Sequence, residues 1–398
     1  MGENGRVTES LILDALLALM LVGYLVYGFR NGLSRSVFTI AGIVVGIIAA
    51  FFLAPVIANL VPVPFLHLGV TVVVAIGFVA LGHALGSAVG RFIRRGILRG
   101  PLSGVDRVLG AVGTTIVAAL VASMVSFSVS QLGVPVLSKA IAGSTVLRVI
   151  NVLTPDPVEA FLAQVRGAVV DKGIPLFTGV LDGTPTIPDV DTGSGALNAA
   201  AQSVVRITGN AYACGVSQSG SGFVVYDDRV VTNAHVVAGV TEPVVETLAG
   251  QSLTGTIVYF DPIDDLAVLA VPGLDAPALP LAATLPATTD AAFEGYPFGG
   301  PFSSGAANVI SVTSPAVPDI YGESRTQREV YTLAADIKEG NSGGPLLTLD
   351  GSVAGVVFAR SGDTANVGYA MTMAELEPVT NQAAGLTDTV SSGACIKE

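Results

Sequence analysis

The sequence predicts four membrane-spanning helices at the N-terminus, followed by an all-β domain of two barrels that ends in a C-terminal helix. Two observations carry this prediction. Hydrophobic residues make up 51% of the 398 residues and charged residues only 13%, whereas soluble globular chains carry about 25% charged residues. Residues 1–150 hold ten Lys/Arg and four Asp/Glu, whereas residues 151–398 hold nine and twenty-seven. This asymmetry indicates that the two parts lie in different environments.

Four apolar stretches in the first part are each near or above the roughly 20 residues that cross a bilayer as a helix. They are residues 11–29, 37–60, 68–90 and 108–132. The first is not expected to be a cleaved signal peptide, because the acidic residues Glu3 and Glu9 precede it and three further stretches follow. We therefore predict a four-span membrane domain over residues 1–135.

The placement of arginine predicts how these spans are oriented. Arg30 and Arg35 follow the first stretch, five arginines follow the third, and the segment VPVPF after the second has no charge. Because cytoplasmic loops are enriched in Lys and Arg, the first and third loops are expected in the cytoplasm. The N-terminus and everything after about residue 135 then lie outside, so the acidic part is expected to be extracytoplasmic or periplasmic.

Glycines recur four residues apart within two of the stretches. They are Gly42 and Gly46, and Gly82, Gly86 and Gly90. This spacing lets helices approach closely. Packing inside one four-helix unit is the simpler interpretation, and a dimerisation face is the alternative.

The first part resembles a known family of small four-span membrane proteins, the colicin V production protein family. The resemblance rests on the early Asp14, the segment GYLVYGFRNGLSR and the glycine-rich stretches, and it covers about residues 8–135. It implies a membrane domain in contact with the lipid bilayer, without a defined biochemical activity.

Residues 136–200 are predicted to be a linker that precedes the β domain. Residues 155–170 have apolar positions near every third or fourth residue, which favours a short amphipathic helix. Residues 201–398 contain about a dozen short runs rich in β-branched residues, such as LAVLAV and AGVVFA, with turns between them. Such runs are typical of β-barrels and sandwiches. The segment MAELEPVTNQAAG predicts one helix near the end.

Three residues of the second part have the chemistry of a nucleophilic catalyst. VVTNAHVV places His235 after a predicted strand, DPIDDLAVLAV places Asp265 directly before one, and GNSGGPLL places Ser342 on a turn. Serine needs a base to take its proton, and histidine, with an ordinary pKa of about 6.5, suits that role. His235 is the only histidine in residues 151–398, so no other histidine can be that base. The alternative is a core histidine and a plain glycine-rich turn.

The same segments, together with SGSGFVV, resemble the trypsin-like serine proteases and most closely their HtrA-type branch. The resemblance covers about residues 201–385 and implies a trypsin-like double β-barrel. Carried over by position, His235 is the base, Asp265 the acid that orients it, and Ser342 the nucleophile. The N–H groups of Gly340 and Ser342 form the oxyanion hole. The family's aspartate directly precedes the apolar strand, which favours Asp265 over the adjacent Asp264.

One departure from the HtrA-type branch is expected. Those proteins normally carry a peptide-binding PDZ domain after the protease, whereas only about 50 residues follow Ser342 and the last strands and helix need them. A PDZ domain is therefore not expected here.

The combination of both parts resembles the actinobacterial MarP family of membrane-anchored serine proteases. The resemblance implies a serine endopeptidase that cuts protein or peptide substrates of the cell envelope and supports resistance to acid and oxidative stress. No cofactor or metal is expected. Nucleic acid is not an expected partner either, because the acidic part would repel phosphates. A catalytically silent adaptor and a regulator of transport through the spans are the alternatives, and the oligomeric state is left open.

Three further residues are candidates for specificity and regulation. Asp336 lies six residues before Ser342, a position that commonly reaches the base of the substrate pocket in trypsin-like folds, where it could favour Arg or Lys. The alternative is a solvent-facing or loop-bonded Asp336. Cys214 and Cys395 are the only cysteines, and in an oxidising compartment they could form a disulfide. That bridge would be either a structural staple or a redox switch.

Overall fold

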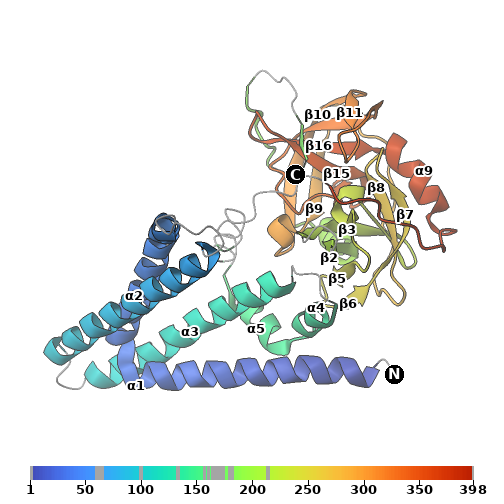
Figure 1. The fold of residues 1–398 in the computed structure, drawn as a ribbon. Helices are drawn as coiled ribbons and strands as arrows, with labels where there is room; N and C mark the ends of the chain where they lie inside the picture. Colours follow the sequence, from blue (N-terminus) through green and yellow to red (C-terminus); the bar gives the residue numbers. More distant parts are fainter. Residues whose placement is uncertain are drawn as a thin grey trace. The chain divides into compact units, whose positions relative to one another are not determined.

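The computed structural model describes residues 3–58, 67–97, 102–130, 135–155, 158, 162, 175–177, 183–211 and 216–396. The chain divides into two compact units, one formed by Asp14–Ser123 and the other by Met1–Leu13 with Met124–Glu398 (Figure 1). Nearly all of the amphipathic helix predicted over residues 155–170 lies outside the described residues, and so does the VPVPF loop.

Three long helices hold the described residues of the four predicted apolar stretches. They are α1 (Glu3–Ala58), α2 (His67–Ile97) and α3 (Leu102–Ser130). The predicted break between the first two stretches lies at Gly32, where φ is 73° and ψ is 166°, so α1 consists of two helices joined across a kink rather than by a loop of several residues. This positive φ is readily available to glycine, so the chain bends there without leaving the helix for more than one residue.

Two helical segments are long and apolar enough to cross a membrane, Ser10–Leu33 and Gly104–Ser126. The other two predicted spans correspond to shorter apolar helices of 10–17 residues, Arg35–Gly46 and Ile76–Phe92. Among the residues that the structure describes, two of the four predicted spans are therefore supported by length and composition.

The glycines spaced by four bring two helices into backbone contact. A Cβ atom placed on Gly42 would collide with the backbone of Gly82 and Gly86, and one on Gly82 would collide with Gly42 and Gly46. The packing interpretation of this spacing is confirmed within the Asp14–Ser123 unit.

The second unit contains a first sheet of seven strands in the order β6-β5-β2-β3-β4-β8-β7. Its strands are β2 (Val204–Ala211), β3 (Val216–Tyr226), β4 (Arg229–Thr232), β5 (Val244–Thr247), β6 (Ser252–Thr254), β7 (Thr256–Asp261) and β8 (Leu266–Ala270). Residues from all seven strands contribute to one apolar cluster or pack against it, so the sheet curls around its own core.

A second sheet follows in the order β1-β15-β14-β9-β10-β13-β16, and β15 also pairs with β16, which closes it into a barrel. Its strands are β1 (Leu176–Phe177), β9 (Asp290–Gly295), β10 (Ser303–Thr313), β13 (Val330–Ala334), β14 (Pro345–Leu347), β15 (Val353–Ser361) and β16 (Val367–Thr372). A separate hairpin is formed by β11 (Ala316–Pro318) and β12 (Arg325–Gln327). The predicted β-branched runs all coincide with strands of the two sheets.

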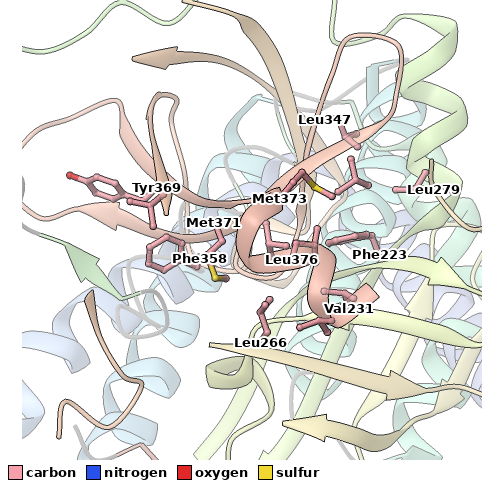
Figure 2. Close-up of a cluster of buried hydrophobic side chains, with 14 of the residues drawn as sticks. Phe223, Val231, Leu266, Leu279, Leu347, Phe358, Tyr369, Met371, Met373 and Leu376 are labelled. Atoms are coloured by element: carbon pink, nitrogen blue, oxygen red, sulfur yellow. The ribbon is translucent and has the colours of Figure 1, made fainter. Parts of the chain in front are cut away.

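An apolar cluster joins the two sheets. Figure 2 shows Phe223, Val231 and Leu266 of the first sheet together with Phe358 and Met371 of the second, all of them buried. The predicted C-terminal helix is α9 (Met373–Ala383), and its Leu376 packs into this cluster. The cluster fixes the two barrels against each other, so side chains from both can meet with defined geometry.

In the described part of the chain, four short α-helices precede or accompany the sheets. They are α4 (Pro135–Ala142), α5 (Thr145–Leu153), α7 (Gly195–Ala200) and α8 (Ala234–Val237). Part of the predicted linker also joins the second barrel as β1, which pairs in parallel with Arg360 and Ser361 of β15.

Candidate active site

His235 lies on α8, directly after β4, and its ring is held by one carboxylate. Its Nδ1 atom is 2.8 Å from Oδ2 and 3.0 Å from Oδ1 of Asp265, and its backbone N–H donates to Oδ1 at 2.9 Å. Both side chains are buried, with His235 6% and Asp265 3% exposed. This contact directs Nε2 away from the carboxylate and leaves it available as a base.

Asp265 reaches His235 because of its backbone conformation. It has a positive φ of 55° immediately before β8, and its carbonyl accepts a hydrogen bond from Asn233 Nδ2 at 2.8 Å. The neighbouring Asp264 is not paired with the imidazole; burial and the nearby Asp261 raise its pKa, which the charge of Arg328 partly offsets. The geometry therefore agrees with the preference for Asp265 over Asp264.

Ser342 lies on a tight turn that enters β14 on the second barrel. Gly340 and Gly343 flank it with φ values of 85° and 82°, a conformation that favours glycine. A Cβ atom on Gly343 would collide with Ser221 O and Thr232 Oγ1, so no larger residue fits. Ser342 is 1% exposed.

The turn also sets the direction of the two predicted oxyanion donors. The carbonyl of Glu339 accepts from Phe298 N at 2.6 Å, and the carbonyl of Asn341 accepts from Gly344 N at 2.9 Å. In a trans peptide the N–H group points opposite to the C=O group, so these bonds aim the N–H groups of Gly340 and Ser342 away from the protein partners. Within the described part of the chain, neither N–H donates a backbone hydrogen bond.

Ser342 Oγ and His235 Nε2 are both buried, and neither has a hydrogen-bond partner among the described residues. The direct bond between them is thus not made in this structure. Such bonds are often long or misaligned in proteins without substrate and tighten when substrate binds.

Ser221, inside the segment SGSGFVV, is a residue that the sequence did not reveal as a functional contact. Its Oγ donates to Gly340 O at 2.6 Å and accepts from Tyr296 N at 2.9 Å, and its backbone N donates to Ser342 O at 2.8 Å. It is fully buried. In the sequence, Ser221 was marked only by its position in a motif shared with the protease family. That motif does not reveal the hydrogen-bond partners of Ser221.

Asp336 is half-exposed and paired with a neighbouring lysine. Its side chain is 53% exposed and forms an ion pair with Lys338 Nζ at 2.6 Å. A carboxylate that is exposed to water and already paired gains little binding free energy from the positive charge of a substrate Arg or Lys. The structure therefore favours the solvent-facing alternative for Asp336.

The two cysteines can be described only in part. Cys214 lies outside the described residues. Cys395 is disulfide-bonded, and a Cβ atom on Gly239 would lie 2.9 Å from its Sγ and 3.3 Å from the methyl group of Ala211.

Glu294 on β9 carries a buried carboxyl group that its sequence context did not identify, and its backbone carbonyl lies against Gly344, next to the Ser342 turn. It is 1% exposed, and neither carboxyl oxygen has a hydrogen-bond partner in the described residues. Burial raises the pKa of Glu294 from its ordinary 4.5 to about 7, and the neighbouring Ser304 hydroxyl offsets only part of this rise. An uncharged carboxyl is the form that such a site favours.

We expect Glu294→Gln to change how the free energy of unfolding depends on pH. Because its folded-state pKa is raised, the wild-type carboxyl contributes stability that is complete below about pH 4.5 and is lost as the pH rises through about 7. This shift corresponds to roughly 3 kcal/mol. The variant should therefore gain roughly 3 kcal/mol relative to the wild type between about pH 4 and pH 9, measured by urea unfolding followed by near-ultraviolet circular dichroism.

Glu242→Gln, at an exposed position before β5, is the matched control for losing one carboxylate. A difference between Glu294→Gln and the wild type that stays constant with pH would show that burial does not alter the titration of Glu294.

Comparisons with known proteins connect both units to described families. The profile of the trypsin-like peptidase domain matches residues 220–356, and that of the colicin V production protein matches residues 13–155. The serine protease Rv3671c of Mycobacterium tuberculosis is 35% identical over 404 residues, which cover 98% of this chain and 100% of that protein. A DegP-like periplasmic serine endoprotease of Hahella chejuensis is 34% identical over 41% of this chain and 35% of its own length.

One solved structure of the protease part of a relative is also similar. The crystal structure of Rv3671c protease from M. tuberculosis in its active form is 37% identical, with a TM-score of 0.51 over 56% of this chain and 100% of that chain. Similarity over the whole length thus extends beyond the protease signature to the membrane part.

Proposed function

This chain belongs to the MarP-type family of serine proteases that includes Rv3671c of M. tuberculosis, and from that membership we propose that it is an endopeptidase with a Ser342–His235–Asp265 triad. One observation carries the proposal: a buried His235 is fixed by Asp265 on the first barrel, while its Nε2 and the Oγ of Ser342 on the second barrel are both without a partner among the described residues.

The proposed reaction follows from these atoms. Ser342 Oγ attacks the carbonyl carbon of the substrate while its proton moves to His235 Nε2, and Asp265 stabilises the imidazolium that forms. The oxyanion is held by the N–H groups of Gly340 and Ser342. The peptide C–N bond then breaks, the leaving amine takes the proton from His235, and water releases the acyl group from Ser342 by the same steps.

The test is covalent labelling of the full chain in detergent with a fluorophosphonate probe. We expect the wild type to be labelled and Ser342→Ala to stay unlabelled, because the probe needs an activated serine. The Ser342→Ala variant should show the same circular dichroism as the wild type. A folded, oxidised wild type that takes up no probe would contradict the proposal, and so would labelling that persists in Ser342→Ala.

We propose that the protease acts outside the cytoplasm. The segment 34–103 between the two supported spans holds five arginines and no Lys, Asp or Glu, which favours a cytoplasmic location. The N-terminus and the protease then lie on the outer side. The same result follows whether two or four spans cross the membrane, because both numbers are even.

The proposal also includes the bounds of the domains, the substrates and the physiological role. They are a four-span anchor over residues 1–135, a linker over 136–200, a protease over 201–398, protein substrates in the cell envelope, and a role in acid and oxidative stress. No specific observation favours the adaptor or transport-regulator alternatives.

We also propose that Cys395 pairs with Cys214. Cys214 is the only other cysteine in the chain, and Ala211, three residues before it, lies beside Gly239, which Cys395 Sγ also approaches. The bridge would close a loop of about 180 residues, for which the chain-entropy account gives roughly 5 kcal/mol. It would tie the first barrel to the C-terminal tail.

A further inference from the structure

A short loop between β9 and β10 packs directly on the oxyanion turn. Its Phe298 N–H donates to the carbonyl of Glu339 at 2.6 Å. A Cβ atom on Gly340 would lie 2.9 Å from Phe298 N and 3.0 Å from Gly299 N, so the two backbones are in close contact. This loop therefore decides where the peptide between Glu339 and Gly340 points.

The same loop is held from the other barrel by a buried ion pair. Arg206 on β2 donates from Nη1 to Gly299 O at 2.9 Å, and its Nη2 is paired with Glu246 on β5. The exposed fractions are 9% for Arg206 and 7% for Glu246. Tyr296, which begins the loop, also donates from its hydroxyl to Val204 O at 3.3 Å. The loop is thus anchored on the first barrel and contacts the oxyanion turn on the second.

A buried ion pair needs a reason beyond stability. Taking both charges out of water costs about as much as their attraction returns, and apolar residues of similar size often serve equally well. Here the pair does something that apolar residues cannot do, because the fork of Arg206 binds the carboxylate and a loop carbonyl at the same time.

We propose that Arg206, held by Glu246, is a positioning residue for the oxyanion hole. Arg206 fixes Gly299, Gly299 fixes Phe298, and the N–H of Phe298 fixes the carbonyl of Glu339. Because the peptide is planar, this last bond aims the N–H of Gly340 at the oxyanion. Arg206 contacts neither the substrate nor the triad in this role. The inference rests on the proposed triad and oxyanion hole.

The role predicts a specific kinetic signature. Stabilisation of the oxyanion exists only in the transition state, so a misdirected donor lowers the rate of the chemical step without weakening substrate binding. Loss of one oxyanion donor costs roughly 100- to 1000-fold in kcat. A donor that is present but poorly aimed should cost roughly 10- to 100-fold.

The experiment compares three forms of the full chain in detergent: the wild type, Arg206→Met/Glu246→Leu and Arg206→Lys. The double variant removes both charges together, so no buried charge is left unpaired. Arg206→Lys keeps the charge beside Glu246 but lacks the fork. We expect the maximal rate of fluorophosphonate labelling and the turnover of quenched-fluorescence casein to fall roughly 10- to 100-fold in the double variant and less in Arg206→Lys.

Two readouts separate positioning from general damage. The probe concentration for half-maximal labelling and the apparent KM for casein should stay within about twofold of the wild type. The midpoint of the pH–rate profile should also be unchanged, since Arg206 does not act on His235. Arg229→Met is the matched control, because Arg229 also donates to a loop carbonyl, Leu386 O at 3.1 Å, which lies after α9 and outside this network. It should leave the labelling rate within about twofold.

The outcomes are distinguishable. An unlabelled wild type contradicts the proposed function itself. A labelled wild type with unchanged rates in both folded variants overturns the role of Arg206, and so does a change confined to KM. If neither variant folds at the assay temperature, the pair is a structural element and the inference is wrong.

Discussion

Replacing Ser342 by Ala is expected to lower kcat for casein by roughly a million-fold, and His235→Ala should do nearly the same. The two side chains act as a unit, because a serine without its base and a base without its serine are both ineffective. The double variant Ser342→Ala/His235→Ala should therefore be no slower than either single variant. Initial rates with quenched-fluorescence casein measure this directly.

The residual rate is as informative as the loss. A rate above that of uncatalysed hydrolysis should persist in all three variants, since the oxyanion donors and the binding surface remain. Additive losses in the double variant would contradict the triad, because they would show that Ser342 and His235 contribute to separate steps.

The catalytic residues could be predicted from the sequence because each one lies in a recognisable local sequence context. His235 is the only histidine outside the membrane part, and Ser342 has glycines where the backbone needs positive φ. Asp265 directly precedes a continuous apolar strand. The two barrels and α9 were predictable for a related reason, since alternating β-branched runs and one helical segment are local patterns.

The supporting network could not be predicted in this way. Arg206 and Gly299 are 93 residues apart in sequence, and Ser221 and Gly340 are 119 apart. Contacts of this kind depend on how the two barrels pack, and the periodicity of apolar residues in the sequence does not indicate them. Glu294 is similarly hidden, because a single glutamate in the run DAAFEG reads as the solvent face of a strand, whereas the structure buries it.

The membrane part shows where composition alone is insufficient. Arg30 and Arg35 suggested a loop of several residues between two apolar stretches, whereas the two helices of α1 meet across a kink at the single residue Gly32. Asp336 illustrates the same limit in the protease, since its distance from Ser342 suggested a pocket, whereas the backbone carries it to the surface. Spacing in the sequence shows which residues are close along the chain, whereas the burial of a side chain depends on how the chain folds.

Asp265→Asn should lower kcat about 10,000-fold while the fold is retained, which is the size of the loss that the same substitution causes in the catalytic triad of trypsin-like proteases. An asparagine can present its N–H₂ group to His235 Nδ1, which then accepts instead of donating. The ring proton moves to Nε2, and that atom can no longer take the proton of Ser342. Turnover of quenched-fluorescence casein measures the loss, and circular dichroism checks that the fold is kept.

Asp264→Asn is the matched control, since it removes the same charge one residue earlier. Asp264 and Asp265 both act on the charge of the buried Arg328, whose pKa burial lowers and these carboxylates raise. Because burial and Asp261 raise the pKa of Asp264, its carboxylate is disfavoured in the folded protein, so Asp264→Asn should not lower stability at neutral pH. Only Asp265→Asn should reduce kcat. Comparing the two variants by thermal unfolding and by casein turnover separates the role of orienting His235 from that of balancing Arg328. A large loss of turnover in Asp264→Asn, with Asp265→Asn nearly as active as the wild type, would transfer the catalytic role to Asp264.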